Sequence, residues 1–197
     1  MTEVTVLRVA DLPQQQTRTV HIATEADLSF VLDLQRRWSN ALGFLPRCCH
    51  ERYIAAKHVL IVRENGLSAG FCNFTVTPRG LVRLPQVAVH HDLLRASIGS
   101  KLLAAITTAA RRGHCEAIRL TSRSDLECNL FWPTAGFRFT CLTRPASTRG
   151  YPLLEWTLPL YDPTDVALAF VQKSRAGRTG RLLIPPTPNF DDKTFLP

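Results

Sequence analysis

Residues 94–100 have the types and spacing that could bind an anion. They read L-R-A-S-I-G-S and separate an apolar run typical of a strand from a periodic run typical of a helix. The first turn of a helix leaves backbone N–H groups unpaired and carries partial positive charge, so small residues there let a phosphate approach closely. Ser97 and Gly99 are small, and Arg95 and Lys101 add positive charge. The pattern predicts a phosphate-binding turn, although turns of this kind also occur where no anion binds.

His90 and His91 are the side chains near this turn that are best suited to proton transfer. Histidine titrates near neutral pH and can act as a general base, directly or through a water molecule. The predicted strand before them, residues 81–89, contains no carboxylate, and Gln86 lies on the same strand face as His90. A histidine at the end of a strand is also often purely structural. A catalytic and a structural role therefore both stay open for this pair.

A strand and two helices are expected before these residues. Residues 18–23 predict a short strand. Thr24 and Asp27 form a capping-box pattern at the start of a first helix, which Gly43 is expected to end. Pro46 is typical of the first turn of a second helix.

Three strands are then expected to lead up to the phosphate-binding turn. Asn65 and Gly66 supply the positive φ angles of a tight hairpin turn, and residues 78–80 form a second turn. Pro85 lies inside the third strand, where a proline removes a hydrogen bond of the ladder. We therefore expect a bulge or an interrupted pairing at this position.

The second half of the chain is expected to alternate between helices and strands again. A helix covers about residues 97–112. After a further strand, the next helix begins with Ser124 or Asp125 as its N-cap and stops at Gly136. Two more strands complete a central mixed, mostly antiparallel sheet. The whole is an α/β (α+β) domain of about 6–7 strands and about 4 helices.

The composition indicates one globular domain with two appended segments. The chain has 197 residues, of which 45% are hydrophobic and 20% charged, as in proteins with a buried core. We divide it into an N-terminal extension (1–17), a domain (18–161) and a basic, proline-containing tail (162–197). No apolar run approaches the ~18 residues of a membrane span, and six scattered cysteines without a Cys-x-x-Cys pair predict no metal site. Such thiols are typical of the reducing cytoplasm, where we expect the protein.

The net charge of +8 suits an anionic partner. Part of the excess lies in two basic stretches, residues 142–150 and 173–181. These stretches favour contact with nucleic acid, or they simply keep the protein in solution. Both interpretations stay open.

The phosphate-binding turn and a second motif together resemble the GNAT superfamily of N-acetyltransferases. F-W-P-T-A-G-F at residues 131–137 matches the family's aromatic pair followed by Gly-Phe. Residues 94–99 match its acetyl-CoA motif, Gln/Arg-x-x-Gly-x-Gly/Ala, with Leu94 at the Gln/Arg position and Ser97 at the first glycine. The resemblance covers roughly residues 19–160. It implies the GNAT fold, in which a splayed gap opens between two central strands.

The resemblance also implies a cofactor, acetyl-CoA or another acyl-CoA, and the residues that bind it. The backbone of the turn would hold the diphosphate, and N–H groups of the strand before it would contact the cofactor arm inside the gap. Helix capping is the alternative role for Asn129, and core packing is the alternative role for Trp132. The implied cofactor contacts are Val87, Val89, Leu94, Arg95, Ala96, Ser97, Ile98, Gly99, Ser100, Asn129 and Trp132.

The activity implied by the resemblance is direct attack of an amine on the acyl thioester, that is, acyl-CoA-dependent N-acyl transfer. Many family members have a strand glutamate and a tyrosine in the aromatic pair. This chain has neither, which leaves His90 or His91 as the candidate base. The acceptor side would be the first two helices and residues 143–151, and the amine is not identified. The alternative functions are an enzyme of this fold that acts on nucleic acid and an acyl-CoA-binding module without catalysis. A homodimer is a further possible assembly.

Overall fold

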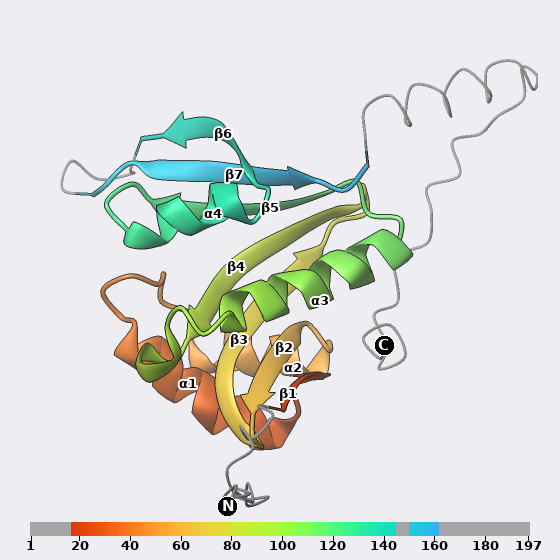
Figure 1. Ribbon diagram of the computed structural model, residues 1–197, viewed down its shortest axis with the longest axis vertical. Helices are drawn as coiled ribbons and strands as arrows, with labels where there is room; N and C mark the ends of the chain where they lie inside the picture. The colour runs from red at the N-terminus through yellow and green to blue at the C-terminus, as the bar shows by residue number, and fades with distance from the viewer. Residues whose placement is uncertain (1–16, 145–149, 162–197) are drawn as a thin grey trace, which may run out of the picture.

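A mixed sheet of seven strands forms the centre of the computed structural model, which describes residues 17–144 and 150–161 (Figure 1). The strands lie in the order β1-β2-β3-β4-β5-β7-β6, and all neighbours are antiparallel except β4 and β5. They are β1 Arg18–Ile22, β2 Val59–Glu64, β3 Leu67–Val76, β4 Leu81–Val89, β5 Ala117–Arg123, β6 Arg138–Thr143 and β7 Leu153–Pro159.

Four α-helices and three short 3-10 turns complete the described part of the chain. The α-helices are α1 Leu28–Arg37, α2 Arg47–Ala55, α3 Ile98–Arg112 and α4 Phe131–Thr134. The 3-10 turns are η2 Glu25–Asp27, η3 His91–Leu93 and η4 Glu127–Leu130. The predicted fold class and element order are therefore confirmed.

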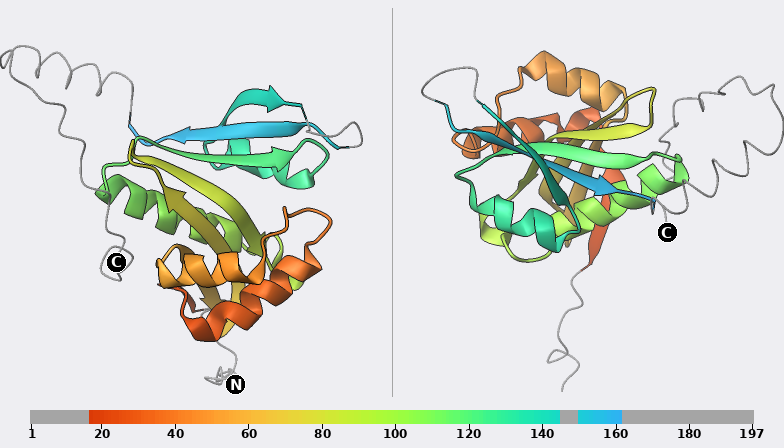
Figure 2. Two further views of the ribbon diagram at one scale, coloured as in Figure 1. Left: turned by 180° about the vertical axis from the view of Figure 1, so that it is seen from behind. Right: turned by 90° about the horizontal axis from the view of Figure 1, so that it is seen from above.

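The helices cover the sheet in layers, as the two views of Figure 2 show. α3 packs on one face, where Leu102 and Ile106 are buried in the larger core. α1 and α2 pack on the opposite face over a smaller core that includes Val31 and Phe71. The two faces of the sheet therefore have different neighbours, and this difference determines which groups meet at the site.

Local sequence signals account for several of the observed boundaries. The N–H of Thr24 donates to Asp27 Oδ2 over 2.9 Å, so the predicted capping box is present. Asn65 and Gly66 have φ angles of 51° and 83° and form the predicted hairpin turn between β2 and β3. Gly113 follows α3 as its C-cap. Each signal acts over a few residues, which is why the sequence alone predicts it.

Pro85 marks the point where the two halves of the sheet separate. β4 pairs with β5 only from Leu81 to Leu84. On its other edge, Leu84 and Pro85 lie opposite the single residue Phe74 of β3, which is a β-bulge. The extra residue of the bulge exchanges the two faces of the strand. Leu84 packs beneath α3, whereas Ala88, four residues later, packs beneath α1 and α2. The predicted bulge is confirmed, and β4 and β5 diverge beyond it (Figure 1).

We call this unpaired stretch, between residues 85–89 of β4 and residues 121–123 of β5, the splayed gap. The fold class implied by the family resemblance includes such a gap, and it is confirmed here.

Two helix boundaries differ from the prediction. α1 ends at Arg37, well before Gly43. The chain that follows α1 is held by hydrogen bonds to the sheet, the first of which joins Trp38 to Val89. The helix expected to begin at Ser124 or Asp125 begins instead as η4, with Leu126 as its N-cap, and α4 has only four residues. Asp125 does not cap the helix because its carboxylate binds the guanidinium of Arg123.

Several sequence predictions lie outside the described residues. These are residues 1–16 of the N-terminal extension, part of the basic stretch 142–150, and the tail 162–197 with its basic residues 173–181. Among the helices that the structure describes, none is long and apolar enough to cross a membrane.

Candidate active site

The backbone of β4 directs two N–H groups into the splayed gap. In an antiparallel ladder, residues bonded to one neighbour alternate with residues whose N–H and C=O groups point the other way. The N–H of His90 donates to Ala69 O over 2.8 Å, which fixes this alternation at the end of β4. Val87 and Val89 therefore direct their backbone groups toward β5, whose pairing with β4 has already ended at Leu84.

Most of these backbone groups have no hydrogen-bond partner among the residues that the structure describes. The carbonyl oxygen of Val89 accepts a hydrogen bond from Trp38 Nε1 over 2.8 Å. For the N–H groups of Val87 and Val89 and the C=O of Val87, no hydrogen bond is formed to any other described residue. An extended ligand that contains amide groups could bond to this edge as an added strand would.

The backbone before α3 forms an open cradle of N–H groups. Arg95 and Ser97 have φ angles of 64° and 62°, a left-handed conformation that costs about 1–2 kcal/mol for a residue with a side chain. The N–H of Lys101 is the first in α3 to bond backward, to Ser97 O over 3.0 Å. Five N–H groups before it have no acceptor within the described ranges: Arg95, Ser97, Ile98, Gly99 and Ser100. They lie at the positive end of the α3 dipole, where an anion is stabilised.

Leu94 and Ala96, the other two predicted residues of this turn, are arranged differently. The N–H of Ala96 donates to Leu93 O over 3.2 Å, and the N–H of Leu94 donates to His91 O over 3.3 Å. Their N–H groups are therefore already bonded, and the cradle consists of alternate residues of the turn followed by the first residues of α3.

Two glycines hold the cradle close to the splayed gap. A Cβ atom on Gly99 would lie 3.6 Å from Phe131 Cζ and 3.9 Å from Val89 Cγ2, so the start of α3 abuts both α4 and the end of β4. A Cβ atom on Gly70 would lie only 3.1 Å from Ile98 Cγ2. Gly70 therefore permits the close approach of α3 to β3, and it was not among the residues that the sequence motifs identified.

Asn129 is hydrogen-bonded within the protein, and Trp132 is buried in the larger core, where its Nε1 has no hydrogen-bond partner among the described residues. Asn129 Nδ2 donates to Arg123 O over 2.7 Å, and Asn129 Oδ1 accepts from Ser122 Oγ and from Trp156 Nε1. Trp132 is 6% exposed and belongs to the larger core. Their surroundings are those expected for structural residues, and contact of either residue with the cofactor stays a prediction.

A network of four buried polar side chains lies on the other face of β4. Gln86, which is 2% exposed, donates to Gln35 Oε1 over 2.7 Å and to the carbonyl oxygen of Gly43. His50 Nε2 lies 3.0 Å from Gln35 Oε1. Asn73 Nδ2 lies 3.4 Å from His50 Nδ1 and 3.3 Å from Gln86 Oε1. The network ties α1, α2 and β3 to the bulge of β4.

This network fixes the protonation of His50 and the role of Gln86. Burial lowers the pKa of His50, so the ring is neutral at pH 7. The hydrogen-bond partners then assign the proton to Nε2, which donates to Gln35, while Nδ1 accepts from Asn73. Gln86 is a neutral amide held by its neighbours and cannot act as a base. No residue of this network other than Gln86 was singled out from the sequence.

The two candidate bases, His90 and His91, have different surroundings. His90 Nδ1 accepts from the N–H of Asp92 over 3.4 Å and caps η3. His91 is exposed, and its ring lies against that of Trp38 with centroids 3.9 Å apart. Because Trp38 also bonds Val89 O, the ring of His91 is connected to the edge of the splayed gap.

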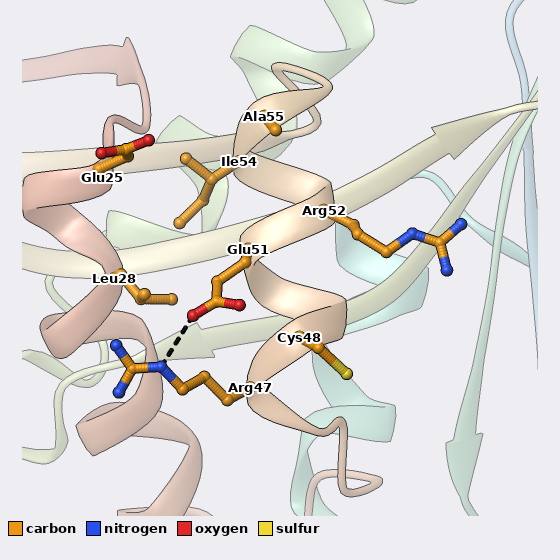
Figure 3. A pocket seen from close by; sticks show the side chains of 8 residues that line it. All are labelled: Glu25, Leu28, Arg47, Cys48, Glu51, Arg52, Ile54 and Ala55. Atoms are coloured by element: carbon orange, nitrogen blue, oxygen red, sulfur yellow. Dashed lines mark hydrogen bonds and ion pairs between the residues drawn. The ribbon is translucent and has the colours of Figure 1, made fainter.

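A cavity of about 720 Å³ lies elsewhere, between η2, α1 and α2 (Figure 3). Its lining includes the ion pair of Arg47 and Glu51, with Nε and Oε1 2.8 Å apart. No lining residue belongs to β4, to the cradle or to α3, so this cavity is not part of the site. Within residues 17–144 and 150–161, no three His, Cys, Asp or Glu side chains are grouped so that they could hold a metal ion.

Comparison with known proteins agrees with this geometry. Residues 26–137, more than half of the chain, match the model of the acetyltransferase (GNAT) family. The fold is similar to Ard1 from Thermoplasma volcanium, with a TM-score of 0.66 and 17% identity over 74% of this chain and 99% of that chain. It is also similar to YncA, a putative acetyltransferase from Salmonella typhimurium solved with its cofactor acetyl-CoA (TM-score 0.65, 20% identity, 74% and 95% covered).

A third similar structure is the ribosomal-protein-S18-alanine N-acetyltransferase from Escherichia coli, with a TM-score of 0.62 and 18% identity over 74% of this chain and 96% of that chain. No curated protein matches the sequence. These likenesses agree with the match to the family model, which rests on the sequence itself.

The chain belongs to the acetyltransferase (GNAT) family. As a member, it is an acyl-CoA-dependent N-acetyltransferase with acyl-CoA as its cofactor, and the two alternative functions are not favoured. The residues present fit this cofactor, because the cradle offers unpaired N–H donors to phosphate groups and the edge of β4 offers unpaired backbone groups to amides.

Proposed function

We propose that acyl transfer takes place in the splayed gap, between an acyl-CoA held on the α3 side and an amine that enters from the side of α1 and α2. One observation carries this proposal. The unpaired N–H groups of the cradle adjoin those of β4, because Gly99 lies against Val89 and Phe131. A ligand with a diphosphate at one end and amides along its arm suits that arrangement.

In this proposal the backbone of the chain does most of the binding. The N–H groups of residues 98–100 would bind the diphosphate, and Arg95 and Lys101 would add positive charge. Val87 would pair with an amide of the cofactor arm, and the N–H of Val89 would orient the acyl carbonyl. When bound, acyl-CoA supplies the thioester that the amine attacks. The contribution of the protein is then mainly positioning and removal of a proton.

We propose His91 as the group that takes the proton of the amine. An ammonium group has a pKa of ~10 and must lose a proton before it can attack. The ring of His91 is exposed beside Trp38, and the amide of Gln86 cannot accept a proton in its place. His90 is the second candidate, because its Nδ1 is already used to accept from Asp92.

We propose that α1, α2 and the loop between them form the acceptor side and determine which amine binds. Nucleic-acid contact through residues 142–150 and 173–181, a homodimer and a cytoplasmic location stay predictions. Contact with nucleic acid would give retention on DNA that falls steeply as salt rises, and deletion of residues 175–181 should weaken it.

A thermal-shift experiment with acetyl-CoA tests the cofactor site. At about 100 times its Kd, acetyl-CoA should stabilise the wild-type protein by about 2.7 kcal/mol. Gly99→Glu places a carboxylate in the cradle and should weaken binding on the order of 100-fold, because like charges repel strongly at a few ångströms. Gly99→Ala is the matched control, since a Cβ there would make an ordinary contact of 3.6 Å with Phe131. Equal stabilisation of the two variants would contradict the proposed site.

Turnover tests the reaction itself. Wild-type protein is mixed with acetyl-CoA and a panel of spermidine, phenethylamine and tripeptides with free N-termini, and products are identified by mass spectrometry. Acetylation of at least one amine, lost in Gly99→Glu and kept in Gly99→Ala, is the expected result. Binding of acetyl-CoA without turnover would instead favour an acyl-CoA-binding module.

A further inference from the structure

Arg123, the last residue of β5, joins two loops that are far apart in the sequence. Its Nε and one terminal nitrogen donate to the two carboxylate oxygens of Asp125 over 3.0 and 2.6 Å. Its other terminal nitrogen donates to Asn40 O, in the loop after α1. The guanidinium carbon also lies 4.7 Å from the centre of the Tyr151 ring, just before β7. One planar side chain therefore contacts three partners at once.

Arg123 lies on the acceptor side of the sheet. Successive side chains of a strand point to opposite faces. Ser122 Oγ donates to Asn129 Oδ1 and accepts from Trp156 Nε1 over 3.0 Å, so its side chain points toward η4 and α4. The side chain of Arg123 therefore points to the opposite face. The loop between α1 and α2 rises toward this end of β5 in Figures 1 and 2.

The loop between α1 and α2, residues 38–46, bridges the splayed gap. On the β4 side, Trp38 Nε1 donates to Val89 O, and Gln86 donates to the carbonyl oxygen of Gly43. On the β5 side, Arg123 donates to Asn40 O. The same loop is therefore bonded to both of the strands that diverge, on the face opposite the cradle.

We propose that Arg123 is a positioning residue for the amine acceptor. By fixing the loop of residues 38–46 and Tyr151 against the end of β5, it sets the width of the opening through which the amine reaches the gap. This inference rests on the proposed function, because it needs acyl transfer to occur in the splayed gap. The charge of Arg123 is already paired with Asp125, so its role is to hold the loops and not to bind an anionic substrate.

The planar fork of the guanidinium is required for this role. Arginine presents five N–H donors in fixed directions and can stack on an aromatic ring at the same time. Lysine offers one compact charge and cannot pair with Asp125, bond Asn40 O and stack on Tyr151 together. Arg123→Lys should therefore restore only part of what Arg123→Ala removes.

Steady-state kinetics with the best amine of the panel above, together with the Kd of acetyl-CoA, test the proposal. In Arg123→Ala the KM for the amine should rise about tenfold, because bonds made by a charged donor are lost, while kcat and the Kd of acetyl-CoA change little. Arg123→Lys should fall between this variant and the wild type. Arg138→Ala, which removes an exposed arginine of β6, is the control and should match the wild type.

Hydrogen exchange gives a second measurement that needs no acceptor. The N–H groups of residues 39–42 should exchange faster in Arg123→Ala than in Arg138→Ala, and those of residues 98–100 should not change. If Arg123→Ala does not fold, Arg123→Lys carries the test. An amine KM and a loop exchange equal to those of Arg138→Ala would overturn the inference, as would parallel losses of amine and acetyl-CoA affinity. A wild-type protein that binds no acetyl-CoA would instead overturn the proposed function.

Discussion

The two sides of the splayed gap are built from different kinds of groups. On the α3 side, the groups available to a ligand are the backbone N–H groups of Arg95, of residues 97–100, and of Val87 and Val89. On the side of α1 and α2, the shape depends on side chains such as Gln86 and Arg123, which bond the loop of residues 38–46. A backbone group is present whatever the side chain is. Cofactor binding should therefore tolerate changes of side chain, whereas the placement of the acceptor loop should not.

The largest effect on stability is expected from removing the amide of Gln86. Gln86→Leu keeps the size of the residue but removes its bonds to Gly43 O, Gln35 and Asn73. Each unsatisfied buried group costs about 1–3 kcal/mol, so we expect the free energy of unfolding in urea to fall by about 3 kcal/mol. Arg83→Ala changes an exposed residue of the same strand and should remain within about 0.5 kcal/mol of the wild type. Equal stabilities of the two variants would show that the network contributes little.

A smaller loss is expected where β3 approaches α3. A Cβ on Gly70 would lie 2.7 Å from the backbone oxygen of Ala88 and 3.1 Å from Ile98 Cγ2, so Gly70→Ala forces β3 and β4 apart and also crowds the start of α3. We expect a loss of about 2 kcal/mol in urea unfolding and weaker binding of acetyl-CoA. Gly43→Ala is the matched control because no heavy atom lies within 4 Å of its added Cβ. Unchanged cofactor affinity in Gly70→Ala would mean that the position of the cradle does not depend on this contact.

The pH dependence of stability distinguishes the two sides further. Burial lowers the pKa of His50, so the unfolded chain binds a proton before the folded protein does as pH falls through ~6.5. The stability contributed by neutral His50 is complete above that pH and is lost below it, by at most about 1.4 kcal/mol per pH unit. Burial also lowers the pKa of His21 and of His58, so a variant without His50 should still lose some stability as pH falls.

Urea unfolding of the wild type and of His50→Gln at about pH 7.5 and about pH 5.5 measures this contribution. The variant should lose less stability on acidification than the wild type. The same loss in both proteins would mean that His50 is not the group that titrates.

The smallest effect is expected in the cradle itself. Ser97→Gly removes the energetic cost of a left-handed conformation at a residue with a side chain, but it also makes the unfolded chain more flexible. Because these two effects oppose each other, the free energy of unfolding should change by less than about 1 kcal/mol. Acetyl-CoA affinity, measured by calorimetry, should be kept or improved because the N–H groups remain. A large loss of affinity would show that the hydroxyl group of Ser97, and not the backbone, binds the ligand.

The same contrast explains how much the sequence could predict. The cradle, the hairpin turn at Asn65 and the bulge at Pro85 depend on neighbouring residues, and their patterns were readable before the structure. The family resemblance then supplied the fold and the cofactor. The early end of α1 was not predicted, because Trp38 leaves the helix to bond Val89, a residue of a distant strand.

The long-range contacts that hold the loop of residues 38–46 could not be predicted for the same reason. Gln35 and Gln86 are 51 positions apart, and Asn40 and Arg123 are 83 apart. Each contact depends on how the sheet brings these segments together, and neither has a local spacing that marks it. The two adjacent histidines were identified as candidates, but only the structure distinguishes His91, beside Trp38, from its neighbour.

The most direct test is an NMR titration of the ¹⁵N-labelled full chain with CoA. We predict that the first backbone amide signals to shift are those of Val87, Val89 and residues 95–100, while the amides of α2 change little. Shifts confined to the cavity of Figure 3, between α1 and α2, would contradict the assignment of the cofactor to the splayed gap.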